Sequence, residues 1–175
     1  MDSGAINRRD FVKYAAATAA GAAMLRATPA WAQSEAKVMP KAFVIGMAPE
    51  KLSMEEKFKL AKECGFDGVE VYPVEDLALA ASYAEAAKAA GIRIHSVMYG
   101  GWKAPFSDPD DAVIAKGLKE MEIALRSAKV MGADTVLLVP AVVNEHVGYR
   151  EAYERSQRHI RKLVPIAEET GVIIA

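Results

Sequence analysis

Lys62-Glu63-Cys64-Gly65 ends a predicted helix, and Gly68-Val69-Glu70-Val71-Tyr72 follows it almost at once as a β-rich run. A glycine just past a helix provides the left-handed cap that ends the helix at low cost. A β-branched run directly after such a cap is typical of a buried strand. This stretch therefore predicts a helix that returns the chain to a parallel sheet.

The same unit recurs along the chain. Three further helix ends carry a glycine at the same place, namely Gly91, Gly132 and Gly171. The predicted strands are Ala42–Met47, Gly68–Tyr72, Ile92–Val97, Thr135–Pro140 and a last one that starts at Val172. Helices with the 3.6-residue period are predicted over 53–64, 76–90, 110–131 and 149–170, with a kink or break at Pro165. Regular alternation of this kind indicates an α/β fold with a parallel sheet covered by helices.

Two architectures fit this pattern, an open doubly wound sheet and a closed (β/α)8 barrel. An open sheet usually has a glycine-rich phosphate loop after its first strand, and Gly46-Met47-Ala48-Pro49-Glu50 has no such spacing. In the barrel alternative, residues 42–175 are the first half, about four and a half βα units. No turn signal follows Val172–Ala175, so we expect the sequence to stop within the fold. A half barrel has two exposed sheet edges, which favours aggregation or a homo-oligomer.

Composition excludes some functions. The 175 residues are 52% hydrophobic, enough for one domain with a core, and the net charge of −1 with no basic block argues against nucleic acid as a partner. Cys64 is the single cysteine, so no internal disulfide can form, and we expect its side chain to be buried as a small hydrophobe.

The N-terminus resembles a twin-arginine export signal. Asn7-Arg8-Arg9-Asp10-Phe11-Val12-Lys13 precedes an alanine-rich apolar run, and Ala30-Trp31-Ala32 has the form of a signal-peptidase site. The apolar run is too short to span a bilayer. We therefore expect a signal peptide over 1–32, a short leader over 33–41 and the partial barrel over 42–175. The Tat export machinery would deliver the protein to the periplasm, with no stable membrane span after cleavage.

Candidate site residues come from the ends of the predicted strands, where parallel α/β folds bind ligands. Glu70 and His95 lie on adjacent strands and are expected to approach each other, either as a substrate-binding or proton-transfer pair or as a structural ion pair. Tyr99, Trp102 and Phe106 in the following loop would form an apolar wall against a sugar or a cap over the barrel mouth. Two other histidines are expected to have no functional role, because His146 is predicted in a solvated loop and His159 on a helix surface.

Several of these segments resemble the sugar phosphate isomerase/epimerase group with the xylose isomerase-like TIM barrel. The segments are Ser53–Val71, Gly91-Ile92-Arg93-Ile94-His95-Ser96 and Ala128–Val136, and the similarity covers roughly residues 42–175. The resemblance implies metal-assisted proton transfer next to a carbonyl in a ketose, keto-sugar or hydroxypyruvate-like substrate. A sugar lyase or dehydratase on the same barrel and a non-catalytic sugar-binding module are the alternatives.

The resemblance also implies where the chemistry would lie. The group binds a divalent metal (Mn, Mg, Co or Zn) through carboxylates and a histidine at the ends of later strands. The catalytic residues and metal ligands are therefore expected beyond Ala175, and no metal ligand is expected within residues 1–175. This fragment is accordingly expected to be inactive, with Glu70, His95, Tyr99 and Trp102 carried over as substrate-binding residues. Val139-Pro140-Ala141 stands where the group's nuclease branch has a histidine, which argues against a nuclease.

Overall fold

A computed structural model describes residues 39–175, and the predicted signal peptide and most of the leader lie outside this range. Residues 40–175 form one compact unit built on a five-stranded sheet. Its strands are β1 (Ala42–Val44), β2 (Gly68–Val71), β3 (Arg93–Tyr99), β4 (Thr135–Leu138) and β5 (Ile173–Ile174). Its α-helices are α2 (Met54–Glu63), α3 (Leu77–Ala90), α4 (Asp111–Met131), α5 (Tyr149–Ile160) and α6 (Val164–Thr170).

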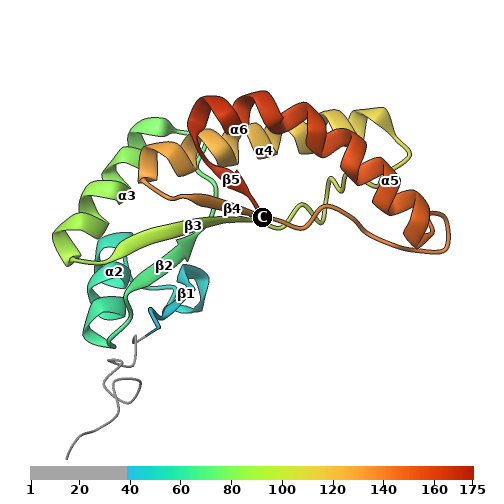
Figure 1. The fold of residues 1–175 in the computed structure, drawn as a ribbon. Coiled ribbons are helices and arrows are strands. Elements are labelled where there is room, and N and C mark those ends of the chain that lie inside the picture. The colour runs from blue at the N-terminus through green and yellow to red at the C-terminus, as the bar shows by residue number, and fades with distance from the viewer. Residues whose placement is uncertain (1–38) are drawn as a thin grey trace, which may run out of the picture. The chain divides into compact units, whose positions relative to one another are not determined.

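The strands pair in sequence order, β1-β2-β3-β4-β5, and every pairing is parallel. Figure 1 shows the helices along one side of a curved sheet, with the other side free of them. A doubly wound sheet has helices on both faces and a reversal in strand order, whereas a barrel has neither. The arrangement therefore confirms the prediction of a partial (β/α)8 barrel.

The helix boundaries follow from their caps. Ser53 and Glu56 form the predicted capping box at the start of α2, and Asp76 caps α3. Gly91 and Gly132 end α3 and α4 in the left-handed conformation, with φ of 67° and 73°. The predicted break in the last helix is confirmed: a 3-10 turn, Arg161–Leu163, separates α5 from α6, and proline lies in the first turn of α6.

The core lies between the sheet and the helices. Alternate strand residues Val69, Val71, Val97 and Val136 are fully buried against the helix layer, which contributes side chains such as Leu125. Because successive side chains point to opposite faces, the residues between these valines lie on the inner face of the curve. That face is open, and Ile173 on it is 64% exposed.

Several strand ends and one burial prediction are wrong at this level. The second and fourth strands end at Val71 and Leu138, before the predicted Tyr72 and Pro140. The first strand ends at Val44, and Ile45–Met47 form a 3-10 turn. The third strand continues through Met98 to Tyr99, two residues beyond the predicted end. Cys64 is exposed, because it is the C-cap residue of α2 and lies where the chain leaves the helix.

Candidate functional site

Glu70 is the acidic group of the inner sheet face. It pairs with Val44 on one side and Ser96 on the other, and it is half-buried. The Ser96 hydroxyl donates a 2.8 Å hydrogen bond to Glu70 Oε1, and Ser96 itself is buried. This bond fixes the carboxylate and leaves its second oxygen without a partner among the described residues. Glu70 can therefore accept a hydrogen bond from a hydroxyl-bearing ligand on the inner face.

His95 lies elsewhere than the sequence suggested. A register shift between Val69 and Glu70 places Ser96, not His95, opposite Glu70. His95 Nε2 is 3.4 Å from Ser96 Oγ, longer than a typical hydrogen bond, and no direct bond joins His95 to Glu70 in the part of the chain described. The prediction that His95 ends a strand is wrong, since it is the third residue of the seven in β3. Its ring packs beside Gly68 and lines a hollow of about 280 Å³ at the amino ends of the strands.

The three aromatic residues after His95 do not form one wall. Tyr99 lies on the helix side of the sheet, where its hydroxyl donates a 2.8 Å bond to Glu120 of α4. Burial, reinforced by Glu120, raises the pKa of Tyr99 well above its usual range. Phe106 is buried in the core, and only Trp102 presents its ring to solvent, at 68% exposure. Tyr99 and Trp102 remain predictions as substrate-binding residues, and the structure separates them.

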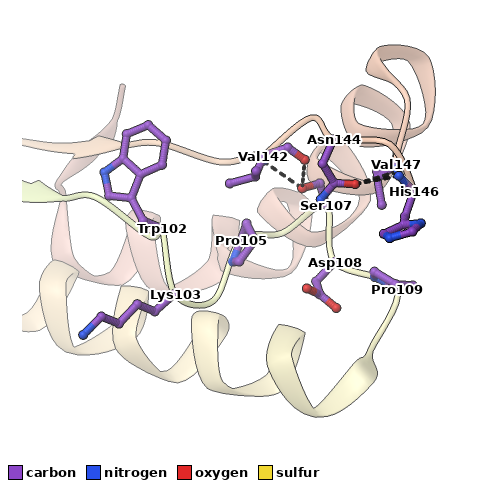
Figure 2. Close-up of a pocket in the computed structure, with 10 residues that line it drawn as sticks. All are labelled: Trp102, Lys103, Pro105, Ser107, Asp108, Pro109, Val142, Asn144, His146 and Val147. Atoms are coloured by element: carbon purple, nitrogen blue, oxygen red, sulfur yellow. Dashed lines mark hydrogen bonds between the residues drawn. The ribbon is translucent and has the colours of Figure 1, made fainter.

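Trp102 borders a hollow of about 360 Å³ between the β3–α4 loop and the β4–α5 loop (Figure 2). The lining residues are Trp102, Lys103, Pro105, Ser107, Asp108, Pro109, Val142, Asn144, His146 and Val147. The two loops are tied together by Ser107, whose hydroxyl accepts from Val142 N–H at 2.9 Å and donates to Val142 C=O at 3.0 Å. Ser96, Asp108 and Asn144 were not predicted as site residues, because a lone serine, aspartate or asparagine carries no spacing signal.

Residues 58–175 match the family described as the xylose isomerase-like TIM barrel. The chain belongs to the xylose isomerase-like TIM barrel family. A second match, over residues 5–24, identifies a twin-arginine translocation signal sequence and confirms that prediction. No curated protein matches the chain.

Solved structures of sugar epimerases share the fold of this family member. D-psicose 3-epimerase, solved in the presence of D-fructose, is 20% identical with a TM-score of 0.67 over 78% of this chain and 51% of its own. The 3-keto-D-glucoside 4-epimerase YcjR of E. coli is 23% identical, with a TM-score of 0.59 over 78% and 55%. L-ribulose 3-epimerase is 18% identical, with a TM-score of 0.63 over 78% and 48%. The chain thus spans about half the length of these relatives.

The xylose isomerase-like resemblance implies a divalent metal, and the described residues do not fit one by themselves. Residues 39–175 contain no group of three His, Cys, Asp or Glu side chains placed to hold an ion. Glu70 has one oxygen engaged by Ser96, and His95 lies beyond Ser96 rather than beside Glu70. What these residues offer is hydrogen bonding to a polar ligand on the inner face and at the loop hollow.

Proposed function

We propose that this chain is part of an exported sugar isomerase or epimerase that moves a proton next to the carbonyl of a ketose, keto-sugar or hydroxypyruvate-like substrate. Three findings support this proposal: the family match, the twin-arginine signal, and the sugar epimerases that share the fold. Because the chain spans about half of those epimerases, the activity belongs to the whole protein rather than to residues 1–175.

The observation that carries the proposal is the placement of Glu70. Val44 and Ser96 flank it on the neighbouring strands, and the Ser96 hydroxyl occupies one carboxylate oxygen, so the second oxygen is an acceptor without a partner among the described residues. Burying an acceptor costs free energy unless a donor satisfies it, and a sugar hydroxyl is such a donor. Glu70 thus binds and orients the substrate.

The proposed site of action is the periplasm. The twin-arginine signal supports it. Separately, no helix within residues 39–175 is long and apolar enough to cross a membrane. Phosphorylated sugars are scarce outside the cytoplasm, so a free sugar, keto-sugar or glycoside is the proposed substrate class. In the proposed domain organisation, residues 1–32 are the signal peptide, residues 33–41 are a leader and the barrel begins at residue 42.

Divalent metal dependence of the whole protein is a proposal that rests on the family resemblance. The same resemblance allows a lyase or dehydratase, because removing the proton next to a carbonyl also begins an elimination. A sugar-binding module without turnover is the candidate from another class. These three alternatives differ in what happens to the carbon-bound proton.

Proton exchange distinguishes them. The full-length gene product is incubated in deuterated water with D-fructose, D-psicose or a 3-keto-D-glucoside, and proton NMR follows the hydrogen next to the carbonyl. We expect loss of that signal, with no exchange after EDTA treatment and none from residues 1–175 alone. Glu70→Gln should slow exchange about tenfold. The matched control, Glu63→Gln on the exposed side of α2, should leave it unchanged.

Each alternative has its own outcome in this experiment. Unsaturated products would favour a lyase or dehydratase over an isomerase. Binding of the sugars without exchange by the full-length protein would contradict catalysis and favour the binding module. Equal rates for Glu70→Gln and wild type would contradict the role given to Glu70.

A further inference from the structure

The hollow between the β3–α4 and β4–α5 loops has the composition of a sugar-binding surface. The indole of Trp102 stands at one end in Figure 2, the His146 ring at the other, and the Asp108 carboxylate between them. An aromatic face packs on the apolar face of a pyranose ring, while carboxylate and imidazole groups bond its hydroxyls. The volume of about 360 Å³ lies within the range of small-molecule sites.

Two polar groups of the hollow keep atoms available for a ligand, whereas His146 Nε2 lies 3.4 Å from Glu145 Oε1 in an exposed pair. Asp108 uses Oδ1 to accept from the Asp110 N–H at 2.8 Å, and no described residue contacts its other oxygen. Asn144 uses its Oδ1 to accept from the backbone of His146 and Val147, each at 2.9 Å, which leaves the amide N–H groups available. Acceptors and donors are therefore both present, as a ligand rich in hydroxyls requires.

The walls of the hollow are held before any ligand binds. Ser107 is 1% exposed, and its paired bonds to Val142 join the two loops. The N–H of Phe106 donates to the Pro140 carbonyl at 2.9 Å, which adds a second link. A preorganised site loses less conformational entropy on binding than a loose one. An exposed indole beside fixed polar groups is thus suited to ligand recognition rather than to loop packing.

We propose that this hollow binds a second pyranose ring, so that the substrate of the proposed sugar enzyme is a glycoside rather than a single sugar. This inference rests on the proposed function for its biological meaning. It places the ring away from Glu70, because the hollow is lined by the two loops and not by the inner-face residues of β2. The ring that reacts and the ring that is recognised therefore occupy different parts of the protein.

Tryptophan fluorescence tests the proposal directly. Trp31 and Trp102 are the two tryptophans of residues 1–175, so Trp31→Phe in this chain leaves Trp102 as the single reporter. Cellobiose, maltose and sucrose are titrated against glucose and fructose. We expect a saturable change with at least one disaccharide and about tenfold weaker binding of its component monosaccharides. Backbone NMR should place the shifts in residues 102–109 and 142–147.

Variants locate the site. Asp108→Asn and Trp102→Ala should each weaken disaccharide binding about tenfold, the latter measured by NMR. Asp111→Asn is the matched control, since Asp111 is exposed nearby but does not line the hollow. It should bind like wild type. A spectrum dispersed as in wild type shows that each variant is folded.

Three results would overturn the proposal: no disaccharide binding, equal binding of monosaccharides, or shifts confined to Glu70 and Ser96. Failure here is distinguishable from failure of the proposed function. Proton exchange on D-fructose by the full-length protein, without binding at the hollow, would retain the sugar enzyme and remove the second subsite. Binding at the hollow without any exchange would retain the subsite and leave a sugar-binding module.

Discussion

Replacing Gly117 with alanine tests whether the β3–α4 loop is held against α4 by direct contact. A Cβ at this position would lie 2.4 Å from the Ala104 carbonyl oxygen and 3.0 Å from the Phe106 ring. Ordinary contact begins near 3.4 Å, so the backbone oxygen would have to move by about 1 Å. The nearest atom belongs to the backbone, and a change of rotamer therefore cannot relieve the overlap.

Two opposing terms decide the sign of the effect. Alanine is favoured over glycine inside a helix by about 0.5–1 kcal/mol. Overpacking costs about 1–3 kcal/mol, and a displaced loop would also weaken the bonds that Phe106 and Ser107 make, at about 1 kcal/mol each. We expect Gly117→Ala to lower the free energy of unfolding by about 1–3 kcal/mol, because the steric and hydrogen-bond terms exceed the propensity gain.

Urea denaturation followed by circular dichroism measures this difference in the full chain. The matched control is Ala115→Gly, the reverse exchange at an exposed position of the same helix. Helix propensity alone predicts a loss of about 0.5–1 kcal/mol for that control. A Gly117→Ala protein as stable as wild type, or more stable, would refute the contact between loop and helix.

Three other substitutions test buried polar groups. Ser107→Ala removes both bonds to Val142 and should lower the free energy of unfolding, measured by urea denaturation, by about 2 kcal/mol. The control Ser82→Ala, on an exposed helix face, should change it little. Equal effects of the two substitutions would contradict the hydrogen-bonded link between the loops. The pKa of Tyr99 is raised by burial and by Glu120, so the folded protein keeps a proton that the unfolded chain loses above pH 10. Wild-type stability should therefore fall more steeply above pH 10 than that of Tyr99→Phe, and parallel curves would contradict this. The pKa of His159 is lowered by burial and by Lys162 and Arg158, against the opposing charge of Asp111, so its contribution to stability is lost as pH falls below 6.5. Between pH 7 and 5, the free energy of unfolding of His159→Leu should therefore fall less than that of wild type. An equal fall in both proteins would contradict a contribution from His159.

The backbone frame of this chain was predictable because its signals are local. The capping box at Ser53 and the left-handed glycines at Gly91, Gly132 and Gly171 each lie within a few residues of the boundary that they set. Buried parallel strands show the apolar runs expected of them, and the order of strands follows from simple alternation. Local rules therefore sufficed for the fold class and for most helix ends.

His159 shows where hydrophobic patterning fails. The sequence places it among Arg155, Arg158 and Arg161, which predicts a surface position, yet it is 8% exposed. The buried face of α5 consists of Ala152, Ser156 and His159, which have the correct helical spacing but little hydrophobicity. Its Nδ1 has no hydrogen-bond partner within the described residues, and its ring lies 6.4 Å from that of Phe106. The burial depends on a contact with Phe106, which is distant in the sequence, and local patterning does not reveal it.

The relation of Glu70 to His95 could not be predicted for a different reason. Counting alternate residues assumes an uninterrupted pleat, and one irregularity moves every later side chain to the other face. Here the shift between Val69 and Glu70 brings Ser96 opposite the carboxylate, so a hydroxyl rather than the His95 imidazole bonds it. The consequence is chemical: a serine cannot raise the basicity of a carboxylate or take its proton at neutral pH, but it fixes the direction of one oxygen. Glu70 is thereby better suited to orienting a sugar hydroxyl than to exchanging protons with His95.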